Sequence, residues 1–114
     1  MSTTVNSVAT EAAGTYMLVR VAGEVDLSWS QQVRRAVLDA LASGQPVAVD
    51  LSAVGYIDSS GIAALVEGLQ GARARRQPFV LVAVSAPVRA VLELARLDSV
   101  FALAASADAA FAAS

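Results

Sequence analysis

The sequence predicts a single α/β domain built on a mixed, mainly parallel sheet. The chain has 114 residues, of which 56% are hydrophobic and only 16% charged, so it can bury a core of ordinary domain size. Segments typical of strands alternate with segments of helical periodicity, a pattern that implies parallel strands joined by right-handed crossovers. No linker or internal repeat interrupts this alternation, so we expect one domain over residues 1–114.

The first part of the chain predicts an antiparallel hairpin. Residues Thr3–Ala9 have a weak strand pattern, and Tyr16–Ala22 (YMLVRVA) a stronger one that is rich in β-forming residues. Gly23 is expected to end the second strand. The turn through Glu11–Gly14 is short, which makes antiparallel pairing the expected arrangement.

A first helix is expected to begin at Ser28, because Ser28 and Gln31 have the spacing of a capping box. It should run to Leu41 or Ala42, and the SGQP sequence of residues 43–46 should stop it. The apolar positions that recur at helical spacing and should face the sheet are Val33, Val37, Leu38 and Leu41.

The rest of the chain continues the alternation. Val47–Leu51 is predicted to be a strand buried on both faces, and Ser52–Asp58 a connection to a second helix over about Ser59–Arg76. The later elements are expected to be a strand at Phe79–Val84, a helix from Ser85–Pro87, a short strand at Val100–Leu103 and a short helix from Ser106 or Asp108.

Composition excludes several classes of enzyme. The chain has no His and no Cys, and its eight basic residues are all Arg. It therefore cannot supply a Ser-His-Asp triad, a Schiff-base lysine, a P-loop or a Cys/His zinc site. The net charge of −2 disfavours nucleic-acid binding. We expect no catalytic activity and neither a cofactor nor a metal.

The sequence also predicts a cytoplasmic protein that does not insert into membranes. No basic residue precedes Arg20, so the charged start of a signal peptide is missing. The longest uncharged stretch, Gln77–Val88, is shorter than the ~20 residues that span a bilayer.

The motif that bears most on function is DSSG at Asp58–Gly61, between a buried strand and a helix. Asp and Ser at a helix start satisfy the free amides of the first turn, so one interpretation is a helix cap alone. A second interpretation is that a serine is modified or docks a partner. A phosphate there would add about −1.5 to −2 charges, which a helix N-terminus tolerates but a docked partner does not.

Two segments resemble the STAS domain of sulfate transporters and anti-sigma factor antagonists: GEVD at residues 23–26 and VDLSAVGYIDSSGIAAL at residues 49–65. Free-standing domains with DSSG resemble the bacterial anti-sigma factor antagonists. The resemblance implies a mixed sheet with helices wound in a β-α superhelix. It also implies a partner-switching regulator of transcription, which binds an anti-sigma factor with ATP-dependent serine kinase activity and thereby frees a sigma factor.

In that family phosphorylation of the first serine of the motif ends the binding, and a serine phosphatase restores it. The resemblance thus implies a phosphoprotein modified at Ser59, with Ser60 as the second choice. Trp29 is added to the partner-binding surface because aromatic residues are common binding hot spots and it lies close to Asp26 in sequence. The partner-binding residues expected are Asp26, Trp29, Asp58, Ser59, Ser60 and Gly61.

Several alternatives remain open at this stage. The chain also resembles STAS accessory subunits that dock on the ATPase of a bacterial lipid-transport ABC complex. Its acidic residues Glu24, Asp26, Asp50 and Asp58 allow a metal or acid–base site. Residues 73–76, with three arginines, form either a solvated helix end or a contact for an anionic partner. An apolar surface around the short last strand would support a homodimer.

Overall fold

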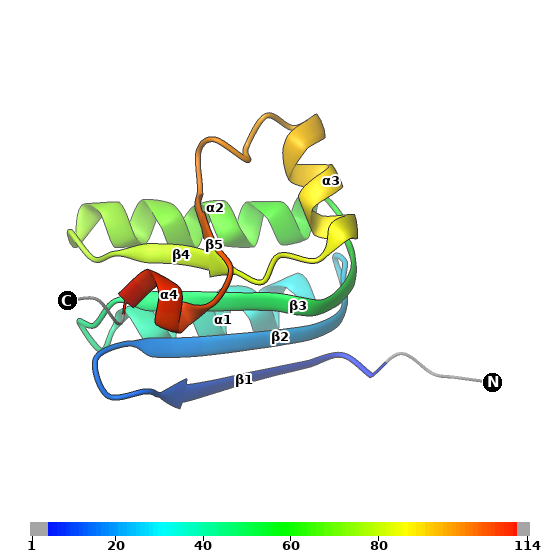
Figure 1. Cartoon of the computed structure of the whole chain (residues 1–114). Helices are drawn as coiled ribbons and strands as arrows, with labels where there is room; N and C mark the ends of the chain where they lie inside the picture. Colours follow the sequence, from blue (N-terminus) through cyan, green and yellow to red (C-terminus); the bar gives the residue numbers. More distant parts are fainter. Residues whose placement is uncertain (1–4, 112–114) are drawn as a thin grey trace.

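A computed structural model describes residues 5–111 of the chain (Figure 1). The first two residues of the predicted strand Thr3–Ala9 lie outside this range. The elements are β1 Ser7–Ala12, β2 Met17–Val25, α1 Ser30–Leu41, β3 Val47–Ile57, α2 Ser59–Ala74, β4 Phe79–Val82, α3 Ala86–Leu94, β5 Ala102–Ala104 and α4 Ala107–Phe111.

The strands form one sheet in the order β1-β2-β3-β4-β5. β1 and β2 are antiparallel, and every other neighbouring pair is parallel. The predicted fold class and the N-terminal hairpin are therefore confirmed. Figure 1 shows α1 and α2 on one side of the sheet and α4 on the other. α3 lies against β3.

The alternation of side chains along each strand produces two hydrophobic clusters. Val47, Val49 and Leu51 of β3 belong to the large cluster with the apolar residues of α1 and α2. Ala48 points to the opposite face, where a smaller cluster includes Ala107 of α4. Both faces of the first half of β3 are covered, as the continuous apolar pattern of Val47–Leu51 predicts.

The strands on either side of the predicted loops are longer than expected. β2 continues through Gly23 to Val25, and β3 continues through residues 52–57, which were expected to be a connection. The pairing of the two strands shifts register between Arg20 and Ala22 and again between Gly23 and Glu24. Such bulges accommodate residues that break the two-residue repeat, so Gly23 and residues 52–57 remain in the sheet.

Gly23 lies at a bulge within β2, and its backbone is in the left-handed region with φ +100°. A Cβ there would lie 2.2 Å from Asn6 Oδ1 and 2.9 Å from Asn6 Cα. The adjacent Glu24 amide donates to Asn6 Oδ1 at 2.8 Å, which attaches the start of β1 to the end of β2. The prediction that Gly23 ends the strand is wrong, because Gly23 forms part of a bulge and the strand continues to Val25.

Replacing Gly23 with Ala is expected to lower the free energy of unfolding by about 2–3 kcal/mol, because left-handed strain and a clash with Asn6 add together. Gly14→Ala is the matched control, since Gly14 also has a positive φ of +79° but no atom near an added Cβ. Urea unfolding should show a loss of only about 1 kcal/mol for Gly14→Ala. Equal losses in the two variants would contradict the close contact with Asn6.

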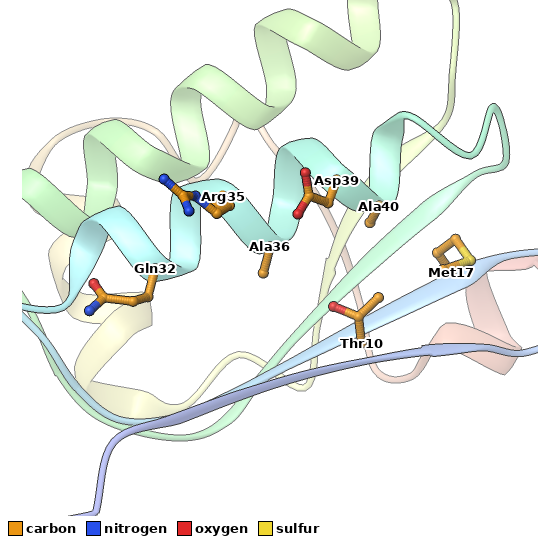
Figure 2. Close-up of a pocket in the computed structure, with 7 residues that line it drawn as sticks. All are labelled: Thr10, Met17, Gln32, Arg35, Ala36, Asp39 and Ala40. Atoms are coloured by element: carbon orange, nitrogen blue, oxygen red, sulfur yellow. The ribbon is translucent and has the colours of Figure 1, made fainter.

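A shallow cavity of about 460 Å³ lies between α1 and the first two strands (Figure 2). Thr10 of β1 and Met17 of β2 form one side of the cavity. The residues that line it from α1 are Gln32, Arg35, Ala36, Asp39 and Ala40. None of the six residues expected to bind a partner lines this cavity, so they belong to a different surface.

Candidate functional site

Two of the predicted site residues are brought together by the ends of β2 and β3. Val25 and Ile57 are the last paired residues of these parallel strands, and Asp26 and Asp58 follow them directly. The Asp58 amide also donates to the Val25 carbonyl at 3.2 Å. Since the carboxyl ends of parallel strands share one edge of a sheet, residues about 30 positions apart in the sequence form one surface.

Asp58 caps α2, as predicted. Its carboxylate accepts hydrogen bonds from the amides of Ser60 at 2.9 Å and Gly61 at 3.3 Å. It also accepts one from the Ser60 hydroxyl at 2.5 Å. The Ser60 hydroxyl is the main cause that lowers the pKa of Asp58, and the amides of Gly61, Ser60 and Leu27 add to it against partial desolvation. Asp58 is thus a fixed negative charge at the start of the helix.

The two serines of the motif differ in what their hydroxyls do. The Ser60 hydroxyl donates to Asp58, and Ser60 is half-buried. Ser59 is exposed at the first position of α2, and within residues 5–111 its hydroxyl makes no hydrogen bond. Only Ser59 therefore presents a free hydroxyl at the surface of this turn.

Gly61 is buried against the end of β2. A Cβ on Gly61 would lie 2.6 Å from Ile57 Cγ1, 2.8 Å from Val25 Cγ1 and 2.9 Å from the Val25 carbonyl oxygen. Another strand of the same chain thus approaches this glycine closely. Gly61 holds the motif against the sheet edge, and the two serines before it face outward or toward Asp58.

The loop between β2 and α1 is organised around Asp26. The Asp26 carboxylate accepts from the Ser28 amide at 2.9 Å and from the Ser28 hydroxyl at 2.6 Å. The capping box expected for Ser28 and Gln31 is wrong, because α1 begins at Ser30 and Ser28 is used by Asp26 instead. The Asp26 carbonyl accepts the amides of Trp29 and Ser30, which starts the helix without a side-chain cap.

Trp29 lies at the N-cap position of α1 and packs partly buried against the large hydrophobic cluster. Its indole Nε1 is buried and has no hydrogen-bond partner among residues 5–111. The ring is therefore mainly an anchor of the loop that contains Asp26. Whether its exposed part also contacts a partner stays a prediction.

The other sequence candidates do not join this surface. Among residues 5–111, no three acidic side chains gather closely enough to hold a metal ion. Asp50 instead accepts from the Ser52 amide at 2.9 Å within β3. The exposed arginines at residues 73–76 lie at the far end of α2, about 24 Å from Ser59 for a helix of 16 residues. No helix in the described part of the chain is long and apolar enough to cross a membrane.

Sequence analysis did not identify Leu27, which lies at this surface. The Leu27 side chain is 75% exposed, while its amide is one of the groups that lower the pKa of Asp58. A single leucine between Asp26 and Ser28 has no periodic neighbours that would mark it as exposed. Only the contact between the β2–α1 loop and the start of α2 reveals its position.

The stability difference between wild type and Asp58→Asn should depend on pH in a defined direction. The folded pKa of Asp58 lies below its unfolded value, so its contribution is present above the unfolded pKa and is lost as pH falls through the folded pKa. At pH 7 we expect Asp58→Asn to be less stable by about 0.5–1 kcal/mol, the usual size of a charge–dipole contribution. Urea unfolding should show the gap closing as the pH falls below the unfolded pKa of an aspartate.

Ser60→Ala is the companion variant in this series, because it removes the hydroxyl that contributes most to the lowered pKa of Asp58. At pH 7 this variant should keep part of the stability that the ionised Asp58 contributes. As the pH falls, it should lose that contribution at a higher pH than the wild type does. A gap between wild type and Asp58→Asn that stays constant down to acid pH would contradict the cap geometry.

A family model described as "Mlab, STAS domain" matches residues 8–104. The chain therefore belongs to the STAS domain family, and the resemblance inferred from the two sequence segments is confirmed. The five-stranded mixed sheet with its helices agrees with the fold expected of that family.

Solved structures of the same fold include regulators of sigma factors. An anti-sigma factor antagonist from Mycobacterium paratuberculosis is 25% identical, with 96% of this chain and 93% of that chain covered and a TM-score of 0.81. SpoIIAA in its unphosphorylated form is 20% identical, with coverage of 91% and 92% and a TM-score of 0.76. The phosphorylated form of SpoIIAA from Bacillus has 20% identity, coverage of 91% and 96%, and a TM-score of 0.71.

Proposed function

We propose that this protein is an anti-sigma factor antagonist that binds an anti-sigma factor through the surface around Ser59. It acts in the bacterial cytoplasm by binding and not by catalysis, and phosphorylation of Ser59 by the kinase activity of that partner ends the complex. A serine phosphatase would then restore the binding form. The observation that carries this proposal is the free, exposed Ser59 hydroxyl beside the capped Asp58.

The likeness to an anti-sigma factor antagonist of 25% identity supports the assignment of the partner. The same fold has been solved for SpoIIAA in phosphorylated and unphosphorylated forms, so the fold is compatible with that modification. Ser59 is exposed and makes no hydrogen bond within residues 5–111, so a phosphate on it would break no contact among these residues.

A phosphate on Ser59 would nevertheless change the surface strongly. It would add about −1.5 to −2 charges next to the ionised Asp58. The amides of Ser60 and Gly61, which could otherwise offset the charge, are already bonded to Asp58. A partner covering this turn would have to remove water from a poorly compensated dianion, which costs several kcal/mol.

The test is the intact mass of the protein purified from its native cells, with peptide mapping across residues 58–61. We expect one phosphate on Ser59 in resting or in stressed growth, and none in a Ser59→Ala strain. Ser60→Ala is the matched control and should still be phosphorylated. A phosphate on Ser60 with Ser59 unmodified would contradict the choice of serine.

An unmodified protein under both growth conditions would contradict the switch. The alternative would then be a constitutive docking role, such as the STAS accessory subunit on the ATPase of a lipid-transport ABC complex. Co-purification of an ATPase with its permease would support that alternative.

A further inference from the structure

We infer that Leu27 and Tyr56 are the apolar anchors of the docking surface around Ser59, and that the partner receives them in an apolar pocket bordered by basic side chains. This inference rests on the proposed function and adds to it the chemistry of the partner's surface.

The main chain of Leu27 is held from both sides. The preceding Asp26 accepts from the amide and hydroxyl of Ser28, and the Leu27 amide faces the Asp58 carboxylate. The side chain is nevertheless 75% exposed. A large apolar side chain on a hydrogen-bonded loop loses little conformational freedom on binding, so most of the free energy gained from its burial goes into affinity.

Tyr56 lies on the neighbouring strand end and is 49% exposed. It is the residue before the last of β3, pairs with Glu24 in the register of the sheet, and precedes Asp58 by two positions. An exposed tyrosine offers a rigid ring and a hydroxyl, which are typical of interface hot spots. Leu27 and Tyr56 therefore lie at the carboxyl ends of β2 and β3, each within two residues of Asp26 or Asp58 along the chain.

The charges around the two side chains have one sign. Residues 24–30 and 56–63 contain Glu24, Asp26 and Asp58 and no basic residue. Arg73, Arg75 and Arg76, which form no salt bridge within residues 5–111, lie at the other end of α2. A surface with carboxylates around apolar anchors is complementary to an apolar pocket with a basic border. Acidic side chains on the partner at that border would repel these carboxylates and oppose docking.

The same arrangement explains why a phosphate at Ser59 would be so effective. Burying Leu27 and Tyr56 in an apolar pocket excludes water from the turn between them, which includes Ser59. A dianion at a dry interface has lost its hydration, whereas at a wet interface it would keep most of it. Apolar anchors therefore make the release by phosphorylation sharper than a polar interface would.

Titration calorimetry between this chain and the purified nucleotide-binding domain of the anti-sigma factor from the same organism tests the inference. ADP in place of ATP keeps Ser59 unphosphorylated. We expect Leu27→Ala to raise Kd at least 10-fold and the Leu27→Ala/Tyr56→Ala pair about 100-fold or more, the range of interface hot spots. Leu94→Ala is the control, since Leu94 is 87% exposed at the end of α3. It should change Kd less than about 3-fold.

The outcomes separate this inference from the proposed function. Wild-type Kd values for both anchor variants, with binding lost in Ser59→Glu, would overturn the inference and leave the proposed function standing. A wild-type chain that does not bind this domain would overturn both. A basic border also predicts that the association rate falls with added salt, and an association rate independent of salt would overturn that part.

Discussion

Ser59→Glu is expected to weaken binding to the anti-sigma factor at least about 100-fold, equivalent to about 3 kcal/mol. The new carboxylate would lie next to the ionised Asp58, whose hydrogen bonds occupy the amides of Ser60 and Gly61. Docking would remove water from both charges, and no described group of this chain compensates the second one. Calorimetry with the purified partner measures the change in Kd.

The fold should not respond to this substitution. Ser59 is exposed and its hydroxyl makes no hydrogen bond within residues 5–111, so the free energy of unfolding should stay within about 1 kcal/mol of wild type. Ser59→Ala is the control and should bind within a few-fold of wild type. Tight binding by Ser59→Glu would exclude charge at this turn as the cause of release.

Gly61→Ala is expected to have the largest effect on stability, with a loss of about 3 kcal/mol or more. The added Cβ would approach Ile57 and Val25 to less than 3.0 Å, and one of the contacted atoms is the Val25 carbonyl oxygen. A backbone atom in a paired strand cannot rotate away as a side chain does. The strand edge or the start of α2 must move, which also disturbs Asp58 and Ser59.

Gly55→Ala is the matched control for this substitution, because an added Cβ at Gly55 meets no atom within 4 Å. Thermal unfolding should place Gly61→Ala more than about 10 °C below wild type and Gly55→Ala within about 2 °C. Similar melting temperatures for the two variants would contradict the contact between α2 and the end of β2.

The regular parts of the fold were accessible to sequence analysis because burial imposes a clear period on them. The end of α1 at Leu41 and the start of α2 at Ser59 match the expected boundaries. The misjudged boundaries of β2 and β3 all fall where bulges interrupt the two-residue repeat. Gly23, Ser52 and Gly55 are residues typical of turns, and only the pairing of the two strands keeps them in the sheet.

The candidate site was predictable in part for a similar reason. The cap formed by Asp58 is a local feature, so the sequence of residues 58–61 was sufficient to predict it. The roles of Ser28 and Leu27 depend on contacts that the sequence does not encode locally, since one serves Asp26 and the other faces Asp58 across two strand ends. The difference between Ser59 and Ser60 likewise appears only once the direction of each hydroxyl is known.

Main chain and side chain have separate tasks at Leu27, and this separation bears on how such a protein can diversify. The amide of residue 27 is one of the groups that lower the pKa of Asp58, whereas its side chain is 75% exposed. If this surface binds a partner as proposed, substitution of that side chain alters the binding at little cost in folding free energy. Two duplicated copies of such a protein can therefore acquire distinct partners through substitutions at a few exposed positions. Each copy then binds its own partner and not the other's, and no substitution along the way has to destabilise the fold.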